Sequence, residues 1–234
     1  EMSQPWGDCE ASGTIVFGNT DVFFSPAART WLKTVMTLDA LDWFQSAAAG
    51  TEHPMFQSIG QKASMFTTCH VQSEAIAEWV LWAGLDFYQR GPERRAAQAA
   101  HEWDRLRYRE ISDTHWLVYG FGGIGEAVGW RLKALGARVT GVRRSGGASA
   151  AADAIVSPHK ARDLHGQVDA ILLCLPHTPE TERMADADFF ASMQEGSLFL
   201  NVGRGSLVDE PALLAALDAG RPAHAALDVL TQEP

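Results

Sequence analysis

The 234-residue sequence has few cysteines and no long apolar run. Its three cysteines, Cys9, Cys69 and Cys174, are odd in number and widely spaced, so they fit neither a disulfide framework nor a metal-ligand pattern. We therefore expect a reducing, cytoplasmic location and no metal site. The longest apolar runs, 79–85 and 170–176, have seven residues each, whereas a membrane-spanning helix needs about 20. No association with a membrane is expected.

Positive charge is also scarce. The chain has 19 lysines and arginines against 29 aspartates and glutamates, which gives a net charge of −10. Nucleic acids and anionic membranes both require a positively charged surface, so we expect neither as a partner. A ligand that carries phosphate must instead be held by a local site.

The two ends lack the features of natural termini. The chain starts at Glu1, without methionine in the first position and without the basic and apolar regions of a secretion signal. It stops at Pro234, directly after a strand-like segment. We expect both ends to be cut, so that a length between one and two typical domains represents two incomplete ones.

From residue 115 onward, short apolar segments alternate with helical ones. Residues 170–173 are apolar on both faces, which is typical of a strand in a parallel sheet covered by helices on both sides. The alternation predicts an α/β fold with a doubly wound parallel sheet, the Rossmann type. The expected strands are 115–119, 138–142, 153–156, 168–175, 197–202 and 223–229, and the expected helices are 124–135, 158–164, 186–193 and 210–219.

The N-terminal part predicts a second, smaller α/β unit, with apolar segments at 14–17, 41–44 and 65–67. Residues 73–89 indicate a helix that is apolar nearly all round, which suits a position between packed layers. We place the domain junction near its start, giving one domain over residues 1–70 and another over residues 71–234. The polar stretch 92–110 is either a second helix or an arm that crosses to another subunit.

The sharpest motif is a glycine-rich loop between an apolar strand and a helix. It consists of Gly120, Phe121, Gly122, Gly123, Ile124 and Gly125, and a second strand follows at residue 138. In such a unit Gly120 permits the tight turn, Gly122 lets backbone amides approach a pyrophosphate, and Gly125 allows close packing of helix against strand. The N-terminus of the helix adds amide donors and partial positive charge. We predict that this unit binds a dinucleotide.

The end of the second strand indicates which dinucleotide. NAD-binding domains usually carry an acid there, which binds the adenosine ribose hydroxyls, but this sequence has Arg143, Arg144 and Ser145. Two guanidiniums and a hydroxyl can pair with a 2′-phosphate, which an acid would repel. The sequence therefore favours NADP (NADPH), with NAD as the second option. The alternative is a solvated loop with incidental arginines.

Charged side chains follow two later strands. Arg204 lies between two glycines, where a guanidinium can hold a carboxylate or polarise a carbonyl. The alternative is a surface arginine paired with Asp209 or Glu210. Asp228 can accept a hydrogen bond from a nicotinamide carboxamide, and Glu233 can support a general acid. Alternatively, both cap a turn.

Together these motifs resemble the D-isomer-specific 2-hydroxyacid dehydrogenase family, and within it the NADPH-dependent glyoxylate/hydroxypyruvate reductases. The segments that carry the resemblance are 45–53 (QSAAAGTEH), 77–78, 120–125, 175–181 (LPHTPET), 201–210 (NVGRGSLVDE) and 227–234. The resemblance implies a Rossmann domain beside a smaller, flavodoxin-like α/β domain. It also implies an oxidoreductase that transfers hydride from NADPH to a small 2-oxo acid and gives the 2-hydroxy acid.

The resemblance further implies roles for single residues. Arg204 matches the catalytic arginine that binds the carboxylate and carbonyl of the 2-oxo acid, and Glu233 matches the acid that orients a catalytic histidine and raises its pKa. Backbone amides of Ala49, Gly50 and Thr51 match a clamp for the substrate carboxylate. The implied cofactor contacts are Gly123 and Ile124 at the pyrophosphate, 143–145 at the 2′-phosphate, Leu175, Pro176 and Thr181 at the riboses, and Val202, Gly203 and Asp228 at the nicotinamide.

In this family the catalytic histidine lies well beyond the position of Pro234, and none of the eight histidines fits the role. His177 falls in the cofactor loop and His53 follows the substrate loop. We therefore expect this piece of chain to lack reductase activity.

The resemblance also implies a homodimer formed through 92–110. The alternative from another class is a non-catalytic, dinucleotide-binding regulator of the corepressor type, and within enzymes the alternatives are phosphoglycerate, lactate and formate-type relatives, most of which use NAD.

Overall fold

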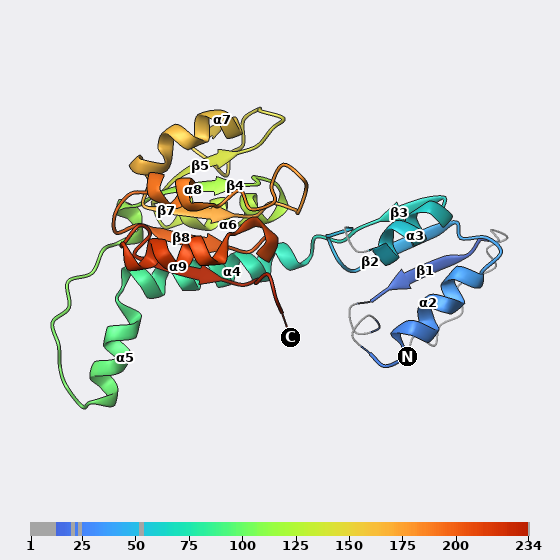
Figure 1. Ribbon diagram of the computed structural model, residues 1–234, viewed down its shortest axis with the longest axis horizontal. Helices are drawn as coiled ribbons and strands as arrows, with labels where there is room; N and C mark the ends of the chain where they lie inside the picture. Colours follow the sequence, from blue (N-terminus) through green and yellow to red (C-terminus); the bar gives the residue numbers. More distant parts are fainter. Residues whose placement is uncertain (1–12, 20–21, 23–24, 52–53, 234) are drawn as a thin grey trace. The chain divides into compact units, whose positions relative to one another are not determined.

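The computed structural model describes residues 13–19, 22, 25–51 and 54–233 (Figure 1). The chain forms two compact units, Glu1–Val71 and Gln72–Pro234, and the second begins with α4 (Gln72–Tyr88). Within the described residues, no helix combines the length and the apolar character needed to cross a membrane.

The first unit contains a three-stranded parallel sheet in the order β1-β2-β3. Phe44 of the central strand is fully buried, and it shares a core cluster with Val35 and Ile59 from the two helices. Both helices therefore lie on one face of the sheet, as right-handed crossovers between neighbouring parallel strands require. The elements are β1 (Ile15–Gly18), α2 (Ala28–Thr37), β2 (Trp43–Ser46), α3 (Pro54–Lys62) and β3 (Met65–Thr67).

The second unit contains a six-stranded parallel sheet in the order β6-β5-β4-β7-β8-β9. Counted from the first strand of this unit, the order is 3-2-1-4-5-6, the arrangement of Rossmann dinucleotide-binding domains. The prediction of a doubly wound parallel sheet is confirmed. The strands are β4 (His115–Tyr119), β5 (Arg138–Val142), β6 (Ala154–Val156), β7 (Ala170–Leu173), β8 (Leu198–Asn201) and β9 (His224–Leu227).

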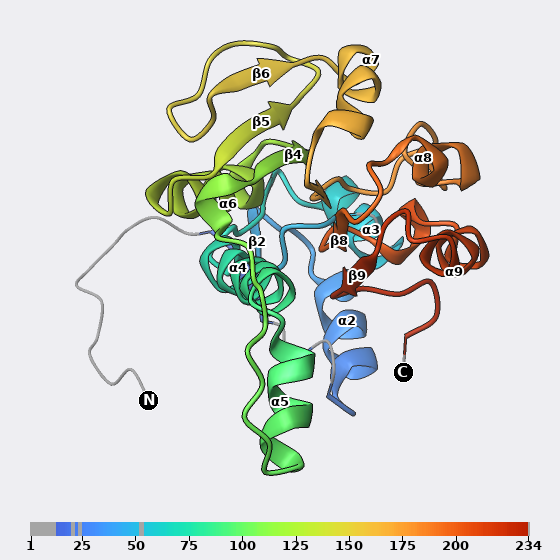
Figure 2. The ribbon, with the colours of Figure 1, turned by 90° about the vertical axis from the view of Figure 1, so that its left-hand side faces the viewer.

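Helices cover both faces of this sheet, as Figure 2 shows. Because side chains of a strand alternate between faces, Trp116 and Val118 join the core cluster beneath α4 and α6 (Gly123–Ala134). Leu117 and Tyr119 join the cluster on the other face, beneath α7 (Pro158–Ala161), α8 (Ala187–Ser192) and α9 (Glu210–Asp218). Burial on both faces explains why β7, at the centre of the sheet, is apolar throughout.

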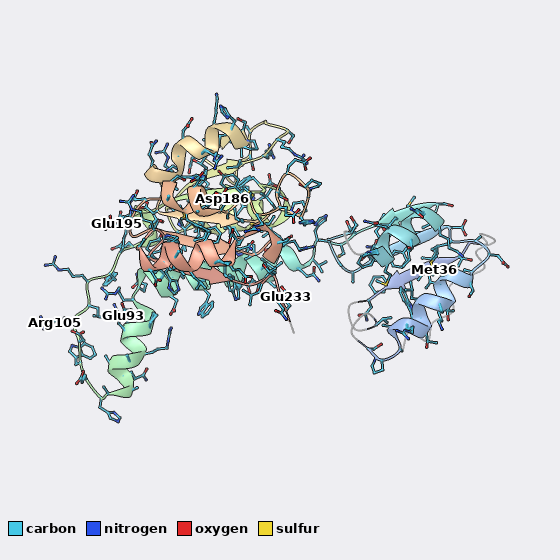
Figure 3. The ribbon with its side chains drawn as sticks, viewed as in Figure 1. Met36, Glu93, Arg105, Asp186, Glu195 and Glu233 are labelled. Atoms are coloured by element: carbon cyan, nitrogen blue, oxygen red, sulfur yellow. The ribbon has the colours of Figure 1, made fainter. Side chains whose placement is uncertain are left out.

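A projecting hairpin leaves the second unit after α4. It consists of α5 (Gly91–Ala99) and residues 100–110, which return without helix or strand structure. Figure 1 shows this hairpin extending away from the sheet, and Figure 3 labels Glu93 and Arg105 on its two arms. The return is anchored at its end, where Arg109 forms an ion pair of 2.6 Å with Asp169. The helix expected within 92–110 is thus present as α5, and the arm that crosses to another subunit stays a prediction.

Several expected boundaries differ from the structure. The strand expected at 41–44 starts two residues later, because β2 begins at Trp43. Leu41 is apolar because it is buried in the core and not because it belongs to the strand. The strands expected at 168–175, 197–202 and 223–229 are all shorter at both ends, because their first and last residues lie outside the paired ladder. The helix expected at 158–164 divides into α7 and the 3-10 helix η2 (Arg162–Gln167).

Candidate dinucleotide site

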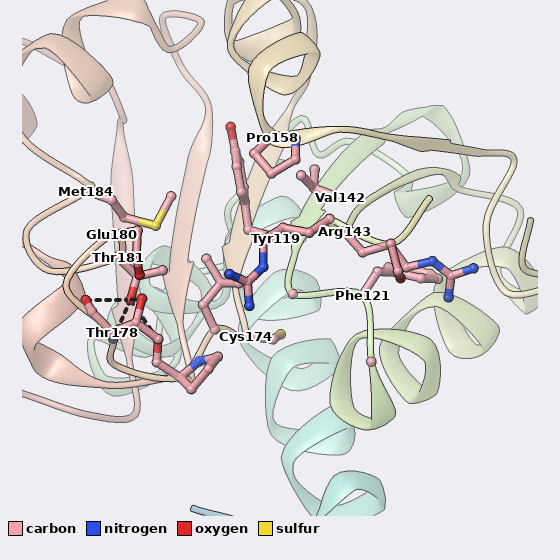
Figure 4. A pocket seen from close by; sticks show the side chains of 16 residues that line it. Tyr119, Phe121, Val142, Arg143, Pro158, Cys174, Thr178, Glu180, Thr181 and Met184 are labelled. Atoms are coloured by element: carbon pink, nitrogen blue, oxygen red, sulfur yellow. Dashed lines mark hydrogen bonds between the residues drawn. The ribbon is translucent and has the colours of Figure 1, made fainter. Parts of the chain in front are cut away.

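A cavity of about 650 Å³ lies at the carboxyl ends of β4, β5 and β7 (Figure 4). β4 and β7 are neighbours in space but not in sequence, so this is the point where the strand order reverses and where open α/β sheets bind ligands. The cavity brings together nine of the expected cofactor residues, namely Gly120, Phe121, Gly122, Arg143, Arg144, Ser145, Leu175, Pro176 and Thr181.

Of the three motif glycines in the glycine-rich loop, Gly122 alone has open space beside it for a ligand. A Cβ on Gly120, whose φ is +82°, would lie 2.6 Å from the carbonyl oxygen of Cys174, and a Cβ on Gly125 would lie 2.7 Å from that of Gly120. A Cβ on Gly122 would meet nothing within 4 Å. Gly120 and Gly125 therefore serve the turn and the packing, whereas Gly122 faces open space. Gly122 is also the N-cap of α6, whose first amides are available to an anion.

Phe121 contributes to the site mainly through its backbone. Its side chain is 2% exposed and packs in the core beneath α6. A Cβ on Gly129 would lie 2.9 Å from its ring, and a Cβ on Gly141 would overlap the ring as well. The Phe121 ring thus locks the glycine-rich loop against β5 and α6.

The two arginines after β5 have different environments. The Nε of Arg143 donates to the Gly146 carbonyl at 2.5 Å and its Nη2 donates to the Ala148 carbonyl at 3.1 Å. Its Nη1 lies 3.7 Å from the carboxylate of Glu126 on α6. The Arg143 side chain therefore braces the loop it belongs to. Arg144 and Ser145 are both exposed and line the cavity.

The loop after β7 forms the opposite wall, where Figure 4 shows Thr178, Glu180 and Thr181 across the cavity from Arg143. The Thr181 hydroxyl donates to the Pro176 carbonyl at 2.8 Å and accepts from the Thr178 amide at 2.8 Å, which closes the loop into a turn. A hydrogen bond from Thr178 and the nearby charge of Arg144 hold the pKa of the Glu180 carboxyl below its usual value. An acid therefore faces the cavity from this side.

Tyr119, at the end of β4, lines the cavity and is held from behind by a buried hydrogen-bond chain. Its hydroxyl lies 2.7 Å from Nε2 of the fully buried His165, whose Nδ1 lies 2.7 Å from the Ser192 hydroxyl. Ser192 donates to the Phe189 carbonyl at 2.6 Å, so its oxygen must accept from Nδ1–H. Nε2 is then the acceptor, and the Tyr119 proton points into the protein rather than into the cavity. Burial lowers the pKa of His165 to about 4 and raises that of Tyr119.

Arg204 lies in the loop after β8, whose shape is fixed by the fully buried Asn201. The Asn201 amide donates to the Arg204 carbonyl at 2.9 Å and accepts from the Gly203 amide at 3.0 Å. The Arg204 guanidinium itself donates to the Gly203 carbonyl at 2.7 Å. Asp209, one of the two acids suggested as partners of Arg204, forms an ion pair with Arg183.

Other expected residues lie outside the cavity. Glu233 is exposed and its carboxylate accepts from the Leu230 amide at 3.1 Å, so in this structure it caps a turn. Asp228 is exposed just after β9. Ala49, Gly50 and Thr51 follow β2 in the first unit, where Ser46 accepts from the neighbouring Ala48 amide at 3.0 Å. His53 lies outside the described residues. Gly123 and Ile124 begin α6, and Val202 and Gly203 are buried after β8.

Seven further residues line the cavity without having been expected there. Thr178 and Glu180 fall inside the 175–181 motif, so the motif itself was a signal for them. Cys174 and Met184 flank that motif, and burial raises the pKa of the Cys174 thiol. Tyr119, Val142 and Pro158 line the cavity as well, and of these Tyr119 and Val142 end strands that lead into recognised loops.

The strand order and the cavity at its reversal point define a dinucleotide-binding domain of the Rossmann type. Residues 81–234 match the family model described as D-isomer specific 2-hydroxyacid dehydrogenase, NAD binding domain. The chain belongs to the D-isomer specific 2-hydroxyacid dehydrogenase family, as its motifs predict.

Individual relatives agree with this assignment. Chloroplastic D-3-phosphoglycerate dehydrogenase 2 of Arabidopsis thaliana is 36% identical over 148 residues, which cover 60% of this chain and 24% of that protein. A D-isomer specific 2-hydroxyacid dehydrogenase from Xanthobacter autotrophicus, solved with NADPH and MES, is 32% identical with a TM-score of 0.65 over 70% of this chain and 67% of that one. The NADPH-dependent glyoxylate/hydroxypyruvate reductase of Sinorhizobium meliloti is 28% identical with a TM-score of 0.66, over 69% and 65%. The chain spans about a quarter to a third of the length of the curated relatives it matches.

Proposed function

We propose that the whole protein is an NADPH-dependent reductase of short 2-oxo acids of the glyoxylate or hydroxypyruvate kind. The observation that carries the proposal is the loop after β5, where Arg144 and Ser145 are exposed at the cavity. A guanidinium and a hydroxyl complement a 2′-phosphate, whereas the ribose of NAD is better matched by a carboxylate at this position. The relative solved with NADPH supports the same choice. Glu180 lies on the opposite wall of the cavity, and its carboxylate can accept hydrogen bonds from ribose hydroxyls. We therefore propose NAD as a second cofactor that binds more weakly.

The reaction we propose would move a hydride from the bound nicotinamide to the carbonyl carbon, while an imidazole, the proton donor that the family resemblance implies, would protonate the carbonyl oxygen. Arg204 binds the carboxylate and stabilises the negative charge that develops on the carbonyl oxygen, a role worth several kcal/mol in a pre-organised site. Within the first unit, the backbone amides of 49–51 are the groups that we propose as a clamp for a substrate carboxylate. Glu233 supports the proton donor by favouring the protonated form of an imidazole. Val202, Gly203 and Asp228 are the residues that would hold the nicotinamide.

A second candidate substrate is D-3-phosphoglycerate, which is favoured by the name of the relatives that are 32–36% identical to this chain. A whole-protein assay distinguishes the two proposals. We expect NADPH oxidation with glyoxylate and hydroxypyruvate at a kcat/KM at least about tenfold higher than NAD reduction with D-3-phosphoglycerate. The opposite ratio would assign the protein to the phosphoglycerate branch. Tight NADPH binding without turnover of any of these acids would favour the non-catalytic regulator.

We further propose that the protein forms a cytoplasmic homodimer through the projecting hairpin. Trp103 is 93% exposed and Tyr108 is 55% exposed on its return arm. Large exposed aromatic side chains on a projecting element are typical of a protein interface. A second copy of the chain is the partner that the family resemblance implies.

A further inference from the structure

Two loops that belong to different parts of the candidate site lie against each other. The cofactor loop, residues 174–185, follows β7 and lines the cavity through Leu175, Pro176 and Thr181. The arginine loop, residues 202–209, follows β8 and carries Arg204. A contact between the two loops can therefore connect ligand binding in the cavity to the position of Arg204.

Backbone contacts fix the two loops at both ends. Gly203 approaches Leu175 so closely that a Cβ on Gly203 would overlap the Leu175 carbonyl oxygen. At the far end the Ala185 amide donates to the Leu207 carbonyl at 3.0 Å, and the Asp209 amide donates to the Ala185 carbonyl at 3.0 Å. The loops are therefore joined by two main-chain hydrogen bonds at the Ala185 end and lie in close contact at the Gly203 end.

A side-chain contact joins the loops between these fixed ends. Nδ1 of His177 lies 3.0 Å from the hydroxyl oxygen of Ser206. His177 directly follows Pro176, a cavity residue, and Ser206 is two residues beyond Arg204 in the 3-10 helix η3 (Gly205–Leu207). The Ser206 carbonyl also accepts from the Arg183 amide at 2.8 Å, so Ser206 meets the cofactor loop through both its side chain and its backbone.

We propose that His177 is a positioning residue that couples occupancy of the cavity to the placement of Arg204 through its hydrogen bond with Ser206. A ligand packed against Leu175 and Pro176 restricts His177, which directly follows Pro176 in the chain. The hydrogen bond passes that restriction to η3, whose short turn cannot move without moving Arg204. The inference rests on the proposed function for the identity of the ligand, NADPH, but the contact between the loops stands on the structure alone.

The test uses hydrogen exchange of this chain with and without saturating NADPH, for the unmodified chain and for Ser206→Ala, His177→Leu and His177→Asn. In the unmodified chain NADPH should slow exchange at 120–125 and at 203–209. A net hydrogen bond of ordinary strength corresponds to about a twofold to tenfold change in local opening. We therefore expect S206A and H177L to lose about that much of the NADPH-induced protection at 203–209, while 120–125 stay protected and the Kd for NADPH changes less than about twofold. H177N, whose amide can reach Ser206, should restore the protection.

Ser112→Ala, on an exposed serine far along the chain from either loop, is the matched control and should behave as the unmodified chain. Unchanged ligand-induced protection at 203–209 in S206A and H177L would overturn the inference. If NADPH protects neither segment in the unmodified chain, the proposed cofactor is wrong. In that case the variants are compared without ligand. Loss of the hydrogen bond between His177 and Ser206 must speed exchange at 203–209 in H177L and at 175–181 in S206A. An absence of both effects contradicts the inference.

Discussion

At the scale of single residues, the proposed preference for NADPH depends on the different roles of Arg143, which holds its loop, and Arg144, which faces the cavity. Arg143 is bonded to two carbonyls of its own loop, whereas Arg144 is exposed at the cavity. We expect Arg144→Ala to raise the Kd for NADPH by about tenfold or more, as for the loss of one charged hydrogen-bond donor to a phosphate, and to leave the Kd for NADH unchanged. Calorimetric titration with both nucleotides measures this.

Arg143→Ala is the companion variant. Because it loosens the loop rather than removing a phosphate ligand, it should weaken both nucleotides by a similar factor. A selective loss of NADPH binding in this variant, with Arg144→Ala unaffected, would reverse the two roles.

The three motif glycines allow a second prediction at this scale. A methyl group on Gly122 meets open space, so Gly122→Ala should change the free energy of unfolding by less than about 1 kcal/mol yet weaken NADPH binding strongly, since it occupies the approach to the pyrophosphate. Gly125→Ala should instead destabilise the fold by about 1–3 kcal/mol, because its Cβ would meet the Gly120 carbonyl. Urea unfolding together with nucleotide titration distinguishes the two. A Gly122→Ala chain that binds NADPH normally would remove Gly122 from the proposed pyrophosphate site.

At the scale of elements, the Tyr119–His165–Ser192 chain ties β4, η2 and α8 together beneath the cavity. The pKa of a histidine in an unfolded chain is near 6.5, but burial lowers the pKa of His165 to about 4 in the folded protein. Between these pH values the unfolded state holds more protons, so this histidine makes stability fall as the pH is lowered from 6.5 to 4. The full shift corresponds to about 3 kcal/mol.

The comparison that checks this effect is the pH dependence of urea unfolding in His165→Gln and in His159→Gln, the latter replacing an exposed histidine on α7. H165Q should be less stable at pH 7 because it disrupts the chain, but it should lose part of the steep dependence between pH 6.5 and 4. H159Q should keep that dependence. Identical slopes in all three proteins would show that His165 is not the responsible group.

The sequence predicts the position of a residue in this domain well where a short local motif determines that position. Gly120, Gly122 and the arginines after β5 lie in a single strand–helix–strand unit, and their places at the cavity follow from the unit itself. Tyr119 and His165 are 46 residues apart, and nothing local in either segment shows that they meet. The division between Arg143 and Arg144 is likewise invisible in sequence, because it depends on which carbonyls the loop turns toward the guanidinium. Strand ends were overestimated because apolar residues continue from the ladder into the loops.

At the scale of the whole molecule, the projecting hairpin predicts self-association. Replacing Trp103, the 93% exposed aromatic on its return arm, with alanine should weaken a homodimer by at least about tenfold, since a buried tryptophan is a common interface anchor. Trp130→Ala is the control, because Trp130 is 56% exposed on α6, outside the hairpin. Light scattering across a concentration series measures both. A chain that is monomeric throughout, or a dimer indifferent to W103A and sensitive to W130A, argues against this interface.

We propose that the cavity at the reversal point of the six-stranded sheet is the binding site for NADPH. The most direct measurement is calorimetric titration of this chain with NADPH and with NADH under identical conditions. We predict one site per chain and a Kd for NADPH at least about tenfold lower than that for NADH. Equal affinity for the two nucleotides, or tighter binding of NADH, would contradict an NADPH-specific site in this cavity.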